Sequence, residues 1–173
     1  EGFCVLNDIA SGIIKMRVER RISRAAVIDL DVHHGNGTAA IFSGDPDTFT
    51  FSMHQENIYP AHKPAGSLDI GLPEGLADAD YLALLEKNLP RVFEGDPELV
   101  VYQAGVDCGE NDLLGGLKIT ASGLLRRDEL VFEACRKRKV PIAVTLGGGY
   151  SRDVNETATL HAQTILTALN ILK

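Results

Sequence analysis

Residues 25–38 read AAVIDLDVHHGNGT, and this stretch decides how the chain folds. Its first part, Ala25 to Leu30, is apolar except for Asp29 and includes β-branched residues, which predicts a buried strand. Two carboxylates and two imidazoles then crowd into residues 29–34. Because an extended chain alternates its faces, we expect Asp29, Asp31 and His33, spaced by two, to project the same way. Because ligands of an open parallel sheet gather beyond the carboxyl ends of its strands, the stretch predicts a central strand with a functional cluster at its end.

Apolar runs of the same kind recur along the chain and alternate with longer segments of helical period. We predict strands at Ala25–Leu30, Thr48–Met53, Leu68–Leu72, Leu99–Ala104 and Ile142–Leu146. We predict helices at Asn7–Arg20, Asp78–Phe93, Ser122–Lys139 and Val154–Leu172, with a short helical turn at Thr38–Phe42. This alternation predicts an α/β fold of three layers, αβα, around a mostly parallel sheet. The 173 residues suffice for one such domain, spanning 1–173.

The charge balance disfavours nucleic acid as a partner. The chain has 17 Lys and Arg against 24 Asp and Glu, a net charge of −7, so it does not attract polyanions overall. Its two basic clusters, Lys15 to Arg24 and Arg136 to Lys139, fall at the ends of predicted helices, where we interpret them as solvated termini. We therefore expect a small or basic partner.

The sequence also predicts where the protein resides. No apolar run approaches the length of a membrane span, and no signal peptide is recognisable, so we expect no membrane partner. Cys4, Cys108 and Cys135 are odd in number and form no CxxC pair, which is typical of a reducing compartment. We expect an intracellular, cytoplasmic protein, with the nucleus also open for a eukaryotic source.

Two further strand ends carry polar residues. The predicted strand at 99–104 leads into AGVDCGEND, which places Asp107 beyond a glycine. The strand at 142–146 leads into GGGY, where three glycines allow close approach to a ligand before Tyr150. Each feature alone has a purely structural interpretation: Asp29 as a turn cap, His33 as a satisfied core histidine, the glycines as a tight connection. Their joint arrival at strand ends favours a functional interpretation.

Asp31, His33 and Asp107 are candidate ligands of a divalent metal. Two carboxylates and one imidazole form a set of three protein ligands, which leaves a fourth position open, as in catalytic zinc sites. A metal held in this way activates water and polarises a carbonyl, which indicates hydrolysis. Tyr150 is the candidate hydroxyl that donates to the developing oxyanion.

Three separated motifs, DLDVHHGNGT, AGVDCGEND and LGGGY, resemble the zinc-dependent histone deacetylase family, which has the arginase/deacetylase fold. The likeness extends from the opening EGFCVLND to the last predicted helix, and DLLGGLKIT with RRDELVF is similar to the class IV branch and its bacterial relatives. The resemblance implies a zinc amidohydrolase that removes acetyl or longer acyl groups from lysine side chains of a protein or peptide. It matches Asp31, His33 and Asp107 to the zinc ligands and Tyr150 to the tyrosine that stabilises the tetrahedral intermediate.

The resemblance also implies a substrate channel. Phe3 matches an aromatic of the tunnel wall, and Gly2 would border the channel that receives the acyl-lysine side chain. Gly148 and Gly149 would line the pocket that receives the acyl group.

A second, structural cation is implied near the first. Asp29 resembles the buried carboxylate that orients a catalytic histidine and also binds a monovalent cation, expected to be potassium, or alternatively sodium. The implied cation site consists of Asp29, Asp31, His33, Ser52 and Met53. His34 is expected to brace the residues around both ions, and we include it with Asp29 and Tyr150 among the catalytic candidates.

The sequence departs from the family in one respect. The tandem histidine pair that supplies the general acid and base is expected shortly before Gly2, and it is not in these residues. We therefore expect the chain to be the C-terminal part of a deacetylase domain, with metal binding retained and turnover reduced. A flank of the sheet would then be uncovered, which predicts association with a companion segment or with itself.

Three alternative functions remain open. An acetylpolyamine or other small-molecule amidohydrolase would use the same chemistry. An arginase-like dinuclear manganese hydrolase would need further aspartates near His33, where the sequence has Asn36. The third alternative is a non-catalytic metal-binding module.

Overall fold

The structure is a computed structural model that describes residues 3–173, so the predicted channel residue Gly2 lies outside the described part. Its centre is a five-stranded sheet in the order β3-β2-β1-β4-β5, and every strand pair is parallel. The strands are β1 (Ala25–Asp29), β2 (Thr48–Gln55), β3 (Leu68–Leu72), β4 (Leu99–Gln103) and β5 (Ile142–Thr145). Each predicted strand is confirmed, with its end displaced by two residues at most.

The helices alternate with the strands as predicted. They are α1 (Asp8–Val18), α2 (Asn36–Ile41), α3 (Asp78–Asn88), the 3-10 helix η1 (Leu89–Phe93), α4 (Ala121–Arg138) and α5 (Val154–Ile171). One prediction was wrong in detail, because the segment expected as a single helix from Asp78 to Phe93 changes to a 3-10 helix at Leu89. Pro90 cannot donate the backbone N–H that would continue α3, but it is tolerated at the start of the new 3-10 helix, where that N–H has no partner.

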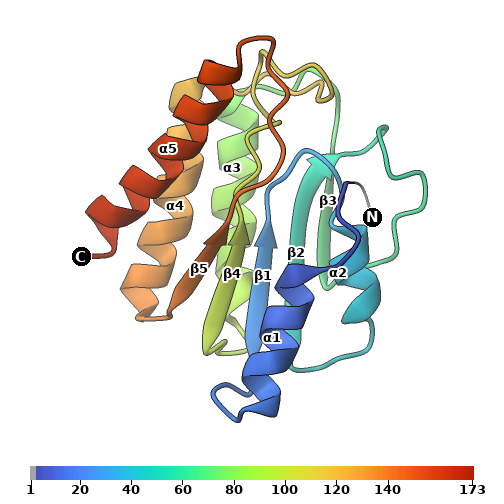
Figure 1. Cartoon of the computed structure of the whole chain (residues 1–173), viewed down its shortest axis with the longest axis vertical. Coiled ribbons are helices and arrows are strands. Elements are labelled where there is room, and N and C mark those ends of the chain that lie inside the picture. Colours follow the sequence, from blue (N-terminus) through green and yellow to red (C-terminus); the bar gives the residue numbers. More distant parts are fainter. Residues whose placement is uncertain (1–2) are drawn as a thin grey trace.

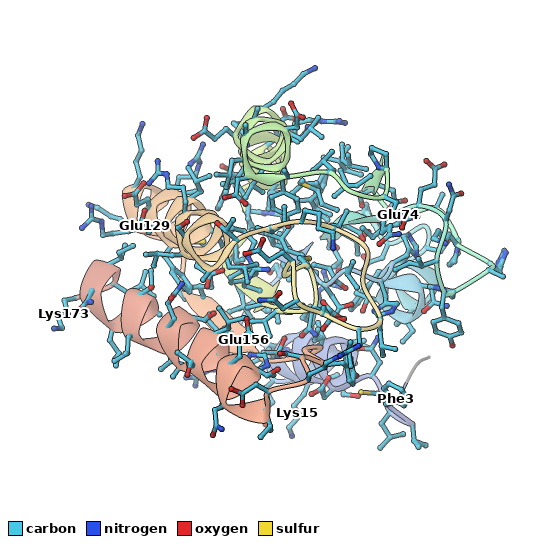
Figure 2. The ribbon with its side chains drawn as sticks, turned by 90° about the horizontal axis from the view of Figure 1, so that it is seen from above. Phe3, Lys15, Glu74, Glu129, Glu156 and Lys173 are labelled. Carbon is cyan, nitrogen blue, oxygen red and sulfur yellow. The ribbon has the colours of Figure 1, made fainter. Side chains whose placement is uncertain are left out.

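The sheet lies between two helical layers, so the predicted αβα architecture is confirmed (Figure 1). Ala26 and Ile28 of β1 join the large core formed with α3, η1 and α4. Ala25 and Val27, which point to the opposite face, join a smaller core with Ile13 of α1. Figure 2, seen from above, shows α3 and α4 on one side of the sheet and α1 on the other. Burial on both faces explains why β1 reads as a nearly continuous apolar run.

Part of the apolar surface is uncovered. α5 packs on α4 through one face, whereas its other face exposes Ile165, Leu166 and Leu169. Strand β5 pairs only with β4 and forms one edge of the sheet. Within residues 3–173, no helix combines the length and the apolarity that crossing a membrane requires.

Candidate metal centre

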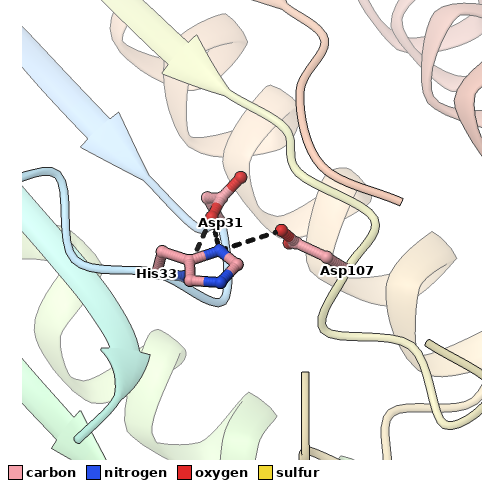
Figure 3. A group of neighbouring side chains, drawn as sticks. All are labelled: Asp31, His33 and Asp107. Atoms are coloured by element: carbon pink, nitrogen blue, oxygen red, sulfur yellow. Dashed lines mark hydrogen bonds and ion pairs between the residues drawn. The ribbon is translucent and has the colours of Figure 1, made fainter. Parts of the chain in front are cut away.

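The structure brings the three predicted metal ligands together at the carboxyl ends of β1 and β4. Asp31, His33 and Asp107 each place one ligand atom within 4.8 Å of the other two. Figure 3 shows the imidazole between the two carboxylates: His33 Nδ1 lies 3.0 Å from Asp31 Oδ1 and 3.3 Å from Asp107 Oδ2. The geometry is therefore that of a compact set of three donors.

A bend in the chain brings Asp31 and His33 together, so the prediction that they share one face of a strand was wrong. We expected Asp29, Asp31 and His33 to share one face of an extended strand, but β1 ends at Asp29. Beyond it, Asp31 Oδ1 accepts a hydrogen bond from the backbone N–H of His33 at 2.8 Å and also contacts the His33 ring. An Asx turn at Asp31, and not the alternation of side chains along a strand, therefore positions Asp31 and His33 relative to each other.

Asp107 reaches the site from β4 and is completely buried. Its Oδ1 accepts a hydrogen bond from the backbone N–H of Val32 at 2.9 Å, which ties the β4 loop to the β1 loop. Gly105 permits this approach, because a Cβ there would lie 2.7 Å from the Cα of Asp31. The two loops that carry the carboxylates are thus packed directly against each other.

The electrostatics of the three residues suit a cation. Burial raises the pKa of Asp107 to about 7, and the negative charge of Asp31 adds to this rise. The carboxylates of Asp107 and Asp31 raise the pKa of His33 to about 10. Asp107 Oδ2 is buried, and the nearest donor atom given for it among the described residues is His33 Nδ1 at 3.3 Å. Two carboxylates and an imidazole in one buried corner fit a divalent metal of the zinc type.

We expect these shifts to make the metal-free protein less stable as the pH rises. Asp107 ionises near 3.8 in an unfolded chain and near 7 in the fold, so the folded state binds more protons between these values and the free energy of unfolding falls with pH. His33 acts in the same direction between 6.5 and about 10. Urea unfolding in chelator from about pH 5 to about pH 8 should show a falling midpoint, and zinc should restore stability at the upper pH because bound metal displaces the protons. A metal-free midpoint that rises across this range would contradict the shifts.

The predicted monovalent-cation residues lie at the adjoining ends of β1 and β2. Asp29 and Ser52 are paired across the two strands, and Met53 follows; all three are buried. Burial raises the pKa of Asp29, and the charge of Asp31 raises it further, so a nearby cation would favour the ionised carboxylate. These contacts are compatible with the cation site, which stays a prediction.

His34 packs beneath this region. Its ring lies 4.5 Å from that of His54 in an edge-to-face contact, and its Nε2 lies 3.3 Å from Asp69 Oδ1. His54 Nδ1 in turn lies 3.0 Å from Ser52 Oγ. His34 therefore contacts the neighbours of Ser52; its bracing role and its catalytic contribution stay predictions.

Tyr150 lies beside the triad in a loop that Asp112 organises. Asp112 Oδ2 accepts a hydrogen bond from the backbone N–H of Tyr150 at 2.6 Å, while its Oδ1 accepts from Leu114 and Gly115 at 2.8 Å each. Burial raises the pKa of the Tyr150 hydroxyl, and the charges of Asp107 and Asp31 raise it further, so the hydroxyl remains a donor. Sequence analysis did not reveal that Asp112 anchors Tyr150.

The glycines before Tyr150 let the loop pass close to the metal ligands. Gly148 and Gly149 have φ values of 67° and 101°, in the region that side chains disfavour. A Cβ at Gly148 would overlap the Asp107 carboxylate, and His161 Nε2 lies 3.1 Å from the Gly148 carbonyl oxygen. Gly148 therefore lies directly against a predicted metal ligand, and the place of Gly148 and Gly149 in an acyl pocket stays a prediction.

A groove of about 1010 Å³ opens over the centre, and Asp31, His33 and Asp107 lie among its lining residues. Phe3 and Tyr150 border it with ring centroids 5.9 Å apart, and Figure 2 shows Phe3 at the periphery of the molecule. Tyr59 borders the groove as well, its ring 6.4 Å from that of His33. Sequence analysis missed Tyr59, for which the only signal was an aromatic residue before Pro60 in a loop without periodicity.

Comparisons with known proteins agree with this geometry. Residues 1–166 match the histone deacetylase domain family. An uncharacterised protein of Picosynechococcus is 43% identical over 93% of this chain and 54% of its own length. Histone deacetylase 2 of Arabidopsis thaliana is 36% identical over 87% of this chain and 40% of its own length.

A solved structure has the same fold. The crystal structure of an acetylpolyamine aminohydrolase from Burkholderia pseudomallei superposes with a TM-score of 0.84 at 27% identity, covering 99% of this chain and 51% of that chain. The present chain thus spans about half the length of the proteins it matches. The match over nearly all of its residues shows that the chain belongs to the histone deacetylase family of hydrolases.

Proposed function

We propose that this chain provides the metal-binding and oxyanion-stabilising part of an active site that hydrolyses N-acetyl or longer N-acyl groups on lysine side chains. The observation that carries the proposal is the convergence of Asp31, His33 and Asp107 next to Tyr150. The ligands would hold Zn²⁺, and the family resemblance supports that metal.

The chemistry follows from the residues around the metal. When bound, the metal supplies a Lewis acid for the amide carbonyl and a nucleophile at neutral pH. Tyr150 donates its hydroxyl proton in a hydrogen bond to the carbonyl oxygen as that oxygen becomes negative. Gly148 brings the loop of Tyr150 directly against Asp107, because a Cβ at this position would overlap the carboxylate.

The walls of the groove suit a lysine side chain. Phe3 and Tyr59 present aromatic surface to the groove, and Tyr59 lies against His33. Such rings pack on a methylene chain and exclude water from it. The net charge of −7 favours a cationic peptide around the modified residue.

Proton transfer requires a base in addition to the metal ligands and Tyr150. His34 packs on His54, His161 contacts the Gly148 carbonyl, and burial lowers the pKa of His54 to about 4. The partners of these three imidazoles are other residues than Asp31, His33 and Asp107, so none of the three is placed as the base by its contacts. The proposed turnover therefore depends on a base outside this set, as the family resemblance implies.

Hydrolysis of acetylated polyamines is the second candidate function. The observation in its favour is the structural match to an acetylpolyamine aminohydrolase. Both candidates use a cationic substrate and the same metal centre, so the groove walls decide between them. A dinuclear, arginase-like site would need ligands for two metals. The described residues hold one cluster of three candidate ligands, Asp31, His33 and Asp107, which favours a single metal.

The test is a comparison of substrates with zinc-loaded protein. We expect release of acetate from an acetyl-lysine peptide to exceed release from an acetylated polyamine at equal concentration. The reverse order would favour the small-molecule function. Zinc binding without turnover of either substrate, persisting after the upstream segment with the histidine pair is restored, would favour a non-catalytic module.

We also propose that the isolated chain associates through its uncovered apolar face. Leu166 and Leu169 on α5 are 59% and 57% exposed, close to other apolar side chains of that helix. Large exposed apolar patches of soluble proteins generally mark contact surfaces. Sedimentation should therefore show a mean mass that rises with concentration, and the double change Leu166→Glu with Leu169→Glu should shift the protein toward monomer. Asn170→Glu, which adds charge on the same helix without removing apolar surface, is the control; a parent chain that stays monomeric throughout would refute the proposal.

A further inference from the structure

Arg127 is a charged residue in the centre of the core. It belongs to α4, yet its side chain is completely buried and is among the largest buried side chains of the protein. Its neighbour Arg126 is the opposite case, with a side chain 44% exposed beside Glu129. A buried guanidinium is costly unless all of its donors are used, so its contacts indicate its purpose.

Those contacts lead to the two loops that carry the metal ligands. Arg127 Nη1 donates to the backbone carbonyl of Gly105 at 2.6 Å and approaches the carbonyl of Leu30 at 3.4 Å. Leu30 directly precedes Asp31, and Gly105 lies two residues before Asp107. One nitrogen therefore bridges the two segments that follow β1 and β4 and lead to the metal ligands.

The guanidinium is itself held in place by Asp128. Arg127 Nε and Nη2 lie 2.9 and 2.8 Å from Asp128 Oδ1. Tyr102 of β4 donates its hydroxyl to the same oxygen at 2.6 Å, and Thr164 of α5 donates to Oδ2 at 2.6 Å. Contacts from α4, α5 and β4 thus fix the plane of the guanidinium group through Asp128. Its remaining nitrogen, Nη1, faces the two carbonyl oxygens.

We propose that Arg127 is a positioning residue for the metal centre, which fixes the carbonyls of Leu30 and Gly105 and so sets the separation of Asp31 and Asp107. The proposal rests on the metal centre proposed above. Its physical reason is that the two carboxylates repel each other in a buried site, while Gly105 already lies against Asp31. A clamp behind the loops keeps the carboxylates together before the metal arrives, as outer residues do at other metal sites.

The test removes the clamp without leaving a buried charge unpaired. Arg127→Met combined with Asp128→Asn replaces the ion pair by neutral groups of similar size. We expect this variant to unfold cooperatively in urea and to bind zinc about 10- to 100-fold more weakly, the usual effect of residues that support metal ligands. Arg126→Met, the matched change on the exposed side of the same turn, should leave zinc affinity unchanged.

A second readout separates positioning from general stability. With Co²⁺ in place of zinc, the visible absorption spectrum reports the ligand geometry, and we expect it to change in the double variant and not in Arg126→Met. Arg127→Lys keeps the charge but offers a single donor point, so it should fold and regain part of the zinc affinity. Parental zinc affinity and an unchanged cobalt spectrum in folded Arg127→Lys or in the folded double variant would overturn the proposal. A parent chain that binds no zinc would instead contradict the metal centre itself.

Discussion

Replacing Asp107 by asparagine should abolish stoichiometric zinc binding while leaving the metal-free fold at least as stable as that of the parent chain. The asparagine keeps a carbonyl oxygen to accept from the Val32 N–H, a bond of 2.9 Å in the parent. It removes the charge from the buried oxygen that faces His33. Loss of one of three ligands should weaken zinc binding by more than the 10- to 100-fold that supporting residues contribute.

The expected gain in stability has a separate cause. Burial, together with the charge of Asp31, raises the pKa of Asp107 to about 7, so above that pH the metal-free fold contains a costly buried charge. Asparagine relieves this cost. Zinc content after gel filtration and urea unfolding in chelator measure the two effects, with Glu110→Gln, an exposed position in the same loop, as control. Full zinc occupancy in Asp107→Asn would remove Asp107 from the ligand set.

Most of the fold could be predicted from sequence, because apolar period and strand ends are local properties. Val27 and Ile28 marked β1, and the end of each predicted strand lay within two residues of its observed end. The candidate ligands could be named for the same reason, since each follows an apolar run. Their convergence could not be derived from period alone, because it depends on the bend at Asp31 and on the contact of Gly105 with Asp31.

The supporting residues were harder to recognise, because each resembles a surface residue in sequence. Sequence analysis assigned no role to Arg127 and Asp128, which share the buried face of α4 with Leu124, Val131 and Cys135. Charges at core-facing helical positions were the available signal. The role of Asp112 had no local signal, because it depends on contacts that only the fold creates: both of its oxygens accept from backbone N–H groups, including that of Tyr150.

The division of labour in the site follows from these contacts. The ligands lie on loops that leave β1 and β4, whereas the residues that hold those loops lie in the helical layer behind them. Tyr150 stands apart, because its loop is held by Asp112 and by the Leu113 N–H, which donates to its carbonyl at 3.3 Å. Metal binding and oxyanion stabilisation should therefore be separable by mutation.

Tyr150→Phe should retain zinc and lose turnover. The change removes one hydroxyl and keeps the ring that packs 5.9 Å from Phe3. The loop should keep its shape, because the bonds from Asp112 involve only the Tyr150 backbone. Loss of a single oxyanion donor lowers kcat by about 10²- to 10³-fold, or about 2.7 to 4 kcal/mol. Steady-state kinetics with an acetyl-lysine peptide, alongside zinc content, should show this fall in kcat at unchanged metal stoichiometry.

Tyr59→Phe provides the matched comparison, because it removes the same atom from the other tyrosine of the groove. Tyr59 contacts His33 through its ring, so we expect this variant to keep kcat and zinc while retaining the aromatic wall. Equal losses of kcat in both variants would show that the groove needs tyrosine hydroxyls in general. Parental kcat in Tyr150→Phe would exclude Tyr150 as the oxyanion donor even if Asp31, His33 and Asp107 bind zinc. The role of Tyr150 can thus be refuted independently of the metal site, because the two depend on different loops.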